Sequence, residues 1–131
     1  MNANSTGIEI SSLGQVAINV HDLDRATAFY RDALGLSLLF TAEGMAFFDC
    51  GGIRLMLARP EKPEFDHPSS LLYFVVPDIL GACRRLLDAA VKIESEPRMI
   101  ARMPGHDLWM GFFRDSEGNM MALMSEVPRS A

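Results

Sequence analysis

The pattern of apolar and polar positions from Gln15 to Leu36 predicts a strand followed by a helix. In its first six residues every second side chain is strongly apolar: Val16, Ile18 and Val20. This alternation is typical of a strand, because successive side chains point to opposite faces. Apolar residues then recur at helical spacing, with Asp22 placed as an N-cap and Gly35 as a left-handed stop. The segment is therefore predicted to form a strand, a short turn and a helix.

A second copy of this pattern begins at Leu71, which takes the place of Gln15, and Asp78 takes the place of Asp22. Later hairpins also correspond, because FFDCGGIRLML and FRDSEGNMMALM place glycine and apolar residues at matching positions. Such self-similarity indicates that the chain consists of two related halves.

The remaining segments complete each half. After the first helix, three strand-like runs, LSLLF, MAFFD and GIRLMLA, are separated by hairpin signals. The second half is predicted to contain a strand at 71–76, a helix from 78 to about 90, a short strand at 92–95, a long loop at 96–107 and a closing strand pair. Residues 60–68 are rich in proline and charge, which indicates a linker.

These elements predict one α+β domain over residues 1–131. It consists of two tandem βαβββ modules, at 13–59 and 69–126, joined by the linker at 60–68. A sheet with a helix on one face leaves its other face free. Two such curled mixed sheets can therefore surround a shared cavity.

The composition is that of a soluble globular protein, with 49% hydrophobic and 22% charged residues. The net charge of −5 and the scattered basic residues argue against nucleic-acid binding. No apolar run approaches the roughly 20 residues that span a bilayer, and the first dozen residues do not resemble a signal peptide. Cys50 and Cys83 lie in different settings, so we expect reduced thiols in a cytoplasmic protein.

Four segments resemble the vicinal oxygen chelate superfamily: VHDLDRATAFYRDALGL, FFDCGGIRLML, FVVPDI and FFRDSEGNMMALMSE. This superfamily includes glyoxalase I, extradiol dioxygenases, methylmalonyl-CoA epimerase and the fosfomycin and bleomycin resistance proteins. The resemblance extends from about Leu13 to Glu126. It implies the glyoxalase/bleomycin resistance/dioxygenase fold, a small-molecule ligand and a homodimer.

Enzymes of this superfamily typically bind a divalent metal through four side chains. The resemblance places those positions at Gln15, Met56, Leu71 and Ala122, of which only Gln15 offers an oxygen. Zinc, nickel, iron and manganese need three or four nitrogen or oxygen ligands, whereas a thioether is soft and leucine and alanine offer no donor. We therefore predict a protein with no metal and no cofactor.

Strand alternation extends these four positions to a predicted pocket. It places Asn19 beside Gln15, Arg54 beside Met56, Tyr73 beside Leu71, and Met120 beside Ala122. His106 and Trp109 are expected near the pocket mouth, at the end of the long loop. The predicted pocket residues are Gln15, Asn19, Arg54, Met56, Leu71, Tyr73, His106, Trp109, Met120 and Ala122.

Arg54 has two interpretations, since its guanidinium could clamp a carboxylate or phosphate or could extend into solvent. His21 and His67 are expected to be solvated surface residues. No serine or cysteine has a histidine at the spacing of a nucleophile and its base.

Two classes of function follow. The first is a metal-free binding protein of the bleomycin-resistance type that holds a small anionic or aromatic molecule. The second is a lyase, isomerase or dioxygenase-type enzyme, or a metal-free catalyst that uses Arg54, Tyr73 or His106 for acid–base chemistry. A structural or regulatory domain is the remaining alternative.

Overall fold

A computed structural model of the chain describes residues 7–129. The first module contains β1 (Gln15–Asn19), α1 (Leu23–Ala28) with a π-helical continuation (Phe29–Ala33), β2 (Ser37–Ala42), β3 (Met45–Cys50) and β4 (Ile53–Ala58). The second contains β5 (Tyr73–Val75), α2 (Ile79–Asp88), β6 (Ile93–Met103), β7 (His106–Arg114) and β8 (Met120–Pro128). A short 3₁₀ helix (Pro63–Phe65) lies between the modules.

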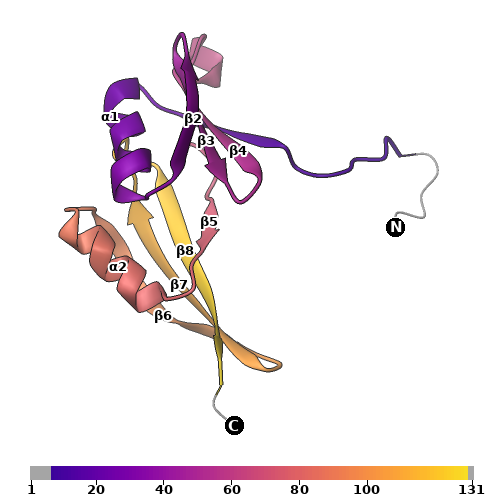
Figure 1. The fold of residues 1–131 in the computed structure, drawn as a ribbon, viewed down its shortest axis with the longest axis vertical. Coiled ribbons are helices and arrows are strands. Elements are labelled where there is room, and N and C mark those ends of the chain that lie inside the picture. Colours follow the sequence, from indigo (N-terminus) through magenta and orange to yellow (C-terminus); the bar gives the residue numbers. More distant parts are fainter. Residues whose placement is uncertain (1–6, 130–131) are drawn as a thin grey trace.

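Each module forms its own four-stranded mixed sheet. The strand order is β1-β4-β3-β2 in the first sheet and β5-β8-β7-β6 in the second. In both sheets the first strand of the module is an edge strand that pairs in parallel with the last strand, and the other pairs are antiparallel. Figure 1 shows the sheets at opposite ends of the long axis of the molecule, with both helices on one side. The predicted α+β fold of two βαβββ modules is confirmed.

Both helices begin where the sequence predicted. The Asp22 carboxylate accepts a hydrogen bond from the backbone N–H of Arg25 at 3.0 Å. Asp78 accepts one from Gly81 at 3.1 Å. These bonds satisfy N–H groups of the first turn that have no partner within the helix. The first helix ends before Gly35, which has a φ of +74° that glycine adopts without strain.

The helix-facing sides of both sheets form one hydrophobic core. Its largest fully buried apolar side chains come from both modules: Tyr30, Phe48, Phe113, Ile18, Leu57, Met121 and Val20. Burial of each such side chain contributes about 1.5–3 kcal/mol before the entropy cost of ordering is subtracted. The alternating apolar residues of the sequence therefore form the interior that joins the two modules.

The prediction of a long loop at residues 96–107 is wrong. β6 continues to Met103, and only the turn at 104–105 separates it from β7. The register of the β6–β7 pair shifts at three places, which obscures the alternation that identifies a strand. Gly111 allows this pairing, because a Cβ atom there would lie 3.2 Å from atoms of Pro97.

Within residues 7–129, no helix is both long and apolar enough to cross a membrane. Cys50 is partly buried and Cys83 is buried, and no disulfide joins them in residues 7–129.

Candidate functional site

The side of the first sheet that faces away from α1 carries most of the polar residues predicted for the pocket. We call this side the first open face; it consists of Gln15, Ala17 and Asn19 on β1, Arg54, Met56 and Ala58 on β4, Phe47 on β3 and Phe40 on β2. Strand register places Gln15 beside Arg54 and Met56 beside Phe47. This register agrees with the expectation that Gln15, Asn19, Arg54 and Met56 share one face, whereas Phe40 and Phe47 were not predicted.

Arg54 is the central charged group of the first open face. Its Nε donates a hydrogen bond to Gln15 Oε1 at 2.7 Å, and its guanidinium lies 5.4 Å from the ring centroid of Phe47. The Phe47 ring stacks on Phe40 with a centroid separation of 4.3 Å. No carboxylate within residues 7–129 forms an ion pair with Arg54. The Arg54 charge therefore lies against an aromatic ring, with Asp49 as its register partner on β3 but outside ion-pair distance.

The corresponding side of the second sheet is mainly apolar. We call it the second open face; it consists of Tyr73 and Val75 on β5, Met120, Ala122 and Met124 on β8, and Met110 and Phe112 on β7. Strand register places Tyr73 and Phe112 on either side of Ala122, and their rings meet edge to face at 6.1 Å. Ala122 is consequently fully buried, while the flexible methionines provide an adaptable surface.

Both open faces keep strongly exposed positions within the single chain, although the linker covers the Asn19 end of the first. Phe40 and Tyr73 are each 47% exposed and Val75 is 73% exposed. Leu71, just before β5, is 44% exposed. One copy of the chain therefore presents most of the predicted pocket residues on two separate open surfaces.

His106 and Trp109 lie elsewhere than the sequence suggested. Both belong to β7 and not to a loop. His106 is at the hairpin end, far along the strand from Ala122, and its Nε2 lies 3.6 Å from the Glu126 carboxylate. Trp109 pairs with buried Ser125 and packs against the core on the helix-covered face. Trp109 is thus not on either open face, because neighbouring residues of a strand point in opposite directions.

The positions that bind metal in similar enzymes do not form a metal site here. Gln15 and Met56 are neighbours, with the Gln15 amide 3.7 Å from the Met56 sulfur. Leu71 has no donor atom, and Ala122 is enclosed by aromatic rings. One carboxamide and one soft thioether do not match a divalent ion that needs three or four nitrogen or oxygen ligands. Within residues 7–129, no three His, Cys, Asp or Glu side chains lie close enough to bind a metal.

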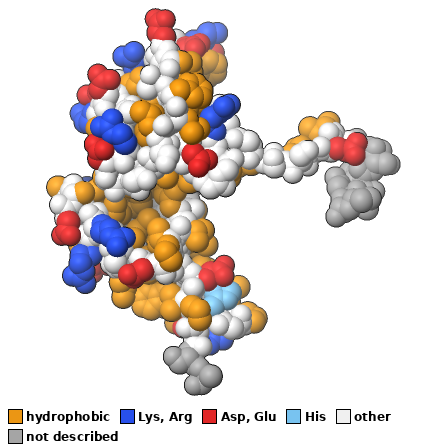
Figure 2. Space-filling model, in the orientation of Figure 1, with side chains coloured by type: hydrophobic (Ala, Val, Ile, Leu, Met, Phe, Trp, Pro, Cys, Tyr) orange, Lys and Arg blue, Asp and Glu red, His pale blue; other side chains and the backbone are white. Residues whose placement is uncertain are grey.

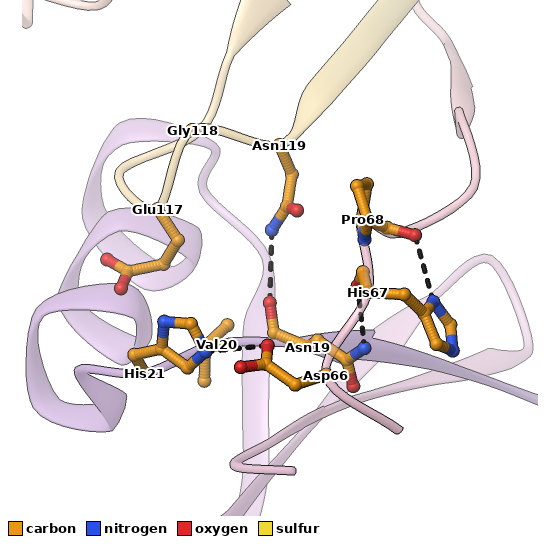
Figure 3. Close-up of a pocket in the computed structure, with 9 residues that line it drawn as sticks. All are labelled: Asn19, Val20, His21, Asp66, His67, Pro68, Glu117, Gly118 and Asn119. Atoms are coloured by element: carbon orange, nitrogen blue, oxygen red, sulfur yellow. Dashed lines mark hydrogen bonds and ion pairs between the residues drawn. The ribbon is translucent and has the colours of Figure 1, made fainter. Parts of the chain in front are cut away.

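A polar hollow of about 280 Å³ lies where β1, the linker and the turn before β8 meet (Figure 3). The Asn19 amide nitrogen donates to the carbonyl oxygens of Phe65 at 2.7 Å and His67 at 2.8 Å. Asn19 therefore holds the linker against β1. His21 Nε2 lies 2.7 Å from Asp66 Oδ1, although the His21 side chain remains 71% exposed. Sequence periodicity gave no signal for these linker contacts.

The turn before β8 also fastens the second module to the first. The Tyr30 hydroxyl donates to Asp115 Oδ2 at 2.7 Å, while Asp115 Oδ1 accepts from the backbone N–H groups of Glu117 and Asn119 at 2.8 Å each. Both side chains are buried. Burial, together with the adjacent Asp115 charge, raises the pKa of Tyr30 above its ordinary value. The phenol therefore remains a hydrogen-bond donor at neutral pH.

Glu117 makes a second connection between the modules. Its carboxylate accepts two hydrogen bonds from the Arg25 guanidinium, at 2.8 and 3.0 Å. It also accepts one from the backbone N–H of Asp22 at 3.2 Å. The hydrogen bond from Arg25 is the main reason that the pKa of Glu117 lies below its ordinary value. We call the contacts of Tyr30, Arg25, Asp115, Glu117 and Asn119 the junction network.

A second hollow between the modules is larger and apolar. Its volume is about 510 Å³, and its walls include Leu36, Cys50, Ile53, Val75 and Val76. We call it the apolar hollow; Figure 2 shows apolar side chains gathered where the two halves of the molecule meet. Burial, with a smaller contribution from the neighbouring Asp49 charge, raises the pKa of Cys50. The Cys50 thiol is therefore protonated at neutral pH and is not an activated nucleophile.

Comparisons with solved structures support this fold. Lactoylglutathione lyase from Agrobacterium tumefaciens matches with 23% identity and a TM-score of 0.69, covering 89% of this chain and 95% of that one. TnmS3, an antibiotic binding protein from Streptomyces sp. CB03234, matches with 22% identity and a TM-score of 0.75, covering 92% and 99%. No curated protein sequence matches significantly.

A family model described as the Glyoxalase/Bleomycin resistance protein/Dioxygenase superfamily matches residues 12–123. The matched region includes both helices and all of the first sheet, together with most of the second. The chain therefore belongs to the glyoxalase/bleomycin resistance protein/dioxygenase superfamily.

Proposed function

We propose that this protein binds a small anionic aromatic molecule without a metal, between the first open face of one copy and the second open face of another. The observation that carries this proposal is the position of Arg54, which is hydrogen-bonded to Gln15 and lies over the ring of Phe47. It combines a positive charge with an aromatic surface on an exposed face. These are the two features that an anionic aromatic ligand requires.

The Arg54 guanidinium is preorganised to bind a carboxylate or phosphate. Gln15 engages its Nε, so the side chain is oriented while the terminal nitrogens can still donate to a ligand. The Phe40 ring, which is 47% exposed and stacks on the buried Phe47 ring, offers a flat surface near this charge. Offset stacking with a ligand ring would contribute about 0.5–1.5 kcal/mol in addition to apolar burial.

The second open face supplies the other wall of the proposed pocket. Met110, Met120 and Met124 have flexible, polarizable side chains that adapt to ligands of different shape. Tyr73 is half exposed beside them, so its hydroxyl could contact a polar ligand group. The similar fold of an antibiotic binding protein supports a binding role.

A homodimer would bring these two walls together. Both faces are exposed in one chain, and each sheet ends in a free edge strand, β1 or β5. Free edges and exposed apolar faces are surfaces that a second copy can cover. Twofold symmetry would create two equivalent pockets, each with one Arg54.

Titration calorimetry with a matched ligand pair tests the ligand proposal. An aromatic carboxylate such as 2-naphthoate should bind more tightly than its neutral amide. Arg54→Ala should weaken carboxylate binding by about 1.5–3 kcal/mol, the usual contribution of a charge-assisted hydrogen bond, and leave the amide unchanged. Arg31→Ala is the control, since Arg31 is an exposed arginine on the helix side, paired with Asp32. Equal binding of the two ligands by the wild-type protein would contradict the proposal.

Two further measurements test the metal-free dimer. Elemental analysis after dialysis should show far less than one equivalent of transition metal, because three of the four expected ligand positions lack a nitrogen or oxygen donor. Light scattering at high micromolar concentration should give twice the 14.5 kDa chain mass. A full equivalent of metal that is lost in Gln15→Ala would contradict the first expectation, and a monomer mass the second.

A further inference from the structure

Arg98 is a second arginine on the walls of the proposed pocket. It lies on β6, where strand register pairs it with Met110 of β7. Met110 pairs in turn with Met124 of β8, and Met124 pairs with Val75 of β5. Residues that pair across neighbouring strands point to the same side of a sheet. Arg98 therefore extends the second open face at its outer edge.

The ion pairs of the second open face do not include Arg98. Arg114 lies on the same face, and its Nε is 3.1 Å from the Glu94 carboxylate. At the other end of the face, His106 Nε2 lies 3.6 Å from the Glu126 carboxylate. Within residues 7–129, no carboxylate lies within ion-pair distance of Arg98. The charge of Arg98 is therefore not engaged by the groups that surround it.

The surroundings of Arg98 suit a ligand with an aromatic body and an acidic edge. The Arg98 side chain is exposed, and the nearest carboxylate along the chain, that of Glu96, forms no ion pair with it. On the inner side lie Met110 and Met124, whose thioethers make favourable contacts with aromatic rings. A ring on these two methionines would bring an acidic substituent at its edge to the Arg98 guanidinium.

We propose that one ligand bridges Arg54 of one copy and Arg98 of another, and that this ligand is an aromatic molecule with two separate anionic groups. The inference rests on the proposed function, because the two arginines share a pocket only if the first open face of one copy meets the second open face of another. It narrows the ligand class from aromatic anions to aromatic dianions.

The positions of the two arginines favour two anionic groups over one. Arg54 lies on β4, an inner strand beside the edge strand β1, whereas Arg98 lies on β6, the edge strand farthest from β5. Neighbouring strands are about 4.8 Å apart, so Arg98 lies about 14 Å across the sheet from β5. Two guanidinium groups at one carboxylate would also repel each other. Each arginine therefore takes its own anionic group, at opposite ends of the aromatic body.

Calorimetry with two ligands of one ring system tests this inference. The probes are 2-naphthoate and naphthalene-2,6-dicarboxylate. Arg98→Ala should weaken dicarboxylate binding about tenfold or more, as expected for loss of a charge-assisted hydrogen bond, and should change naphthoate binding less than about twofold. Arg54→Ala should weaken both. Arg84→Ala is the matched control and should change neither, since Arg84 is an exposed arginine on α2 that also forms no ion pair within residues 7–129.

Three results of this experiment would overturn the inference. No effect of Arg98→Ala on either ligand would leave its side chain in solvent. An equal loss for both ligands would mean that the two arginines share one carboxylate. A dimer that dissociates more readily in sedimentation, with dicarboxylate affinity unchanged, would assign Arg98 to subunit contact. If Arg54→Ala changes neither ligand, the proposed function itself fails, whatever Arg98 does.

A heterodimer tests whether the two arginines come from different copies. Co-expression of Arg54→Ala and Arg98→Ala chains with different affinity tags allows the mixed dimer to be purified. One of its pockets should lack both arginines and the other should keep both, so it should bind the dicarboxylate with wild-type affinity at half the wild-type stoichiometry. Each variant alone should show no such binding. Weak binding by the heterodimer, or failure to isolate it, would contradict a pocket shared between copies.

Discussion

The junction network and the two open faces differ in how completely the chain satisfies its own polar and apolar groups. In the network, Asp115 accepts hydrogen bonds from Tyr30 and from two backbone N–H groups, and all these atoms lie within one chain. Every buried side-chain nitrogen or oxygen in residues 7–129 has a hydrogen-bond partner. On the open faces, Arg54 forms no ion pair with any carboxylate of residues 7–129, and Tyr73 and Val75 remain exposed.

This difference separates the part that stabilises the fold from the part available for binding. Buried groups that are fully paired make each partner costly to remove. Exposed groups without partners contribute little to stability and can interact with another molecule. Substitutions in the network should therefore affect unfolding, whereas substitutions on the open faces should affect binding.

Asp115→Ala should have the largest effect. It leaves the buried Tyr30 hydroxyl and the backbone N–H groups of Glu117 and Asn119 without their acceptor. We expect the free energy of unfolding to fall by about 3 kcal/mol or more, measured by urea denaturation. Asp88→Ala, at the exposed end of α2, is the control and should change stability by less than about 0.5 kcal/mol. Equal destabilisation by the two variants would contradict the claim that the junction network stabilises the fold more than exposed surface residues do.

Arg54→Ala should weaken binding and leave stability almost unchanged, whereas Asp115→Ala should reduce stability. The expected loss of about 1.5–3 kcal/mol in carboxylate binding should be accompanied by a change of less than about 1 kcal/mol in the free energy of unfolding. Urea denaturation and calorimetry on the same preparation measure both quantities. A variant that unfolds easily and still binds would mean that Arg54 supports the sheet and not a ligand.

Tyr30→Phe should destabilise the protein by about 1.5 kcal/mol, since a hydrogen bond to a charged group is lost while the ring packing is kept. Thermal unfolding should register this loss, and carboxylate affinity should be unchanged. Tyr73→Phe is the matched control, because Tyr73 lies half exposed on the second open face. A smaller loss of stability in Tyr30→Phe than in Tyr73→Phe would contradict the assigned roles.

Glu117→Gln should have the smallest effect: the Glu117 side chain is only 4% exposed, but glutamine keeps an oxygen that can accept from Arg25, and Arg25 is 59% exposed, so solvent screens its charge. The folded-state pKa of Glu117 lies below its ordinary value of about 4.3. Its contribution to stability is therefore complete above that value and is lost as pH falls through the folded-state pKa. The stability difference between wild type and Glu117→Gln should shrink in acid. A difference that stays constant from neutral pH to pH 3 would contradict the role of this ion pair.

Several features were predictable because their causes are local in sequence. Alternation identified β1 and β4, and together with the resemblance to the superfamily it placed Arg54 on the same face as Gln15. Asp22 and Asp78 marked the helix starts, because a capping side chain bonds to backbone only three residues away. Only the start of β6 was predicted, because Pro97 and irregular pairing interrupt its alternation, and the rest of the strand is stabilised by β7.

The sequence by itself therefore determined the two βαβββ modules, the face assignments of regular strands, and the lack of metal-binding atoms at Met56, Leu71 and Ala122. Tertiary structure alone decided that Asn19 holds the linker, that Trp109 packs against the core, and that Asp115 joins the modules. The physical reason is the separation along the sequence of the residues that interact. Periodicity and capping depend on residues a few positions apart, whereas burial and hydrogen-bond partners depend on segments that meet only when the chain has folded.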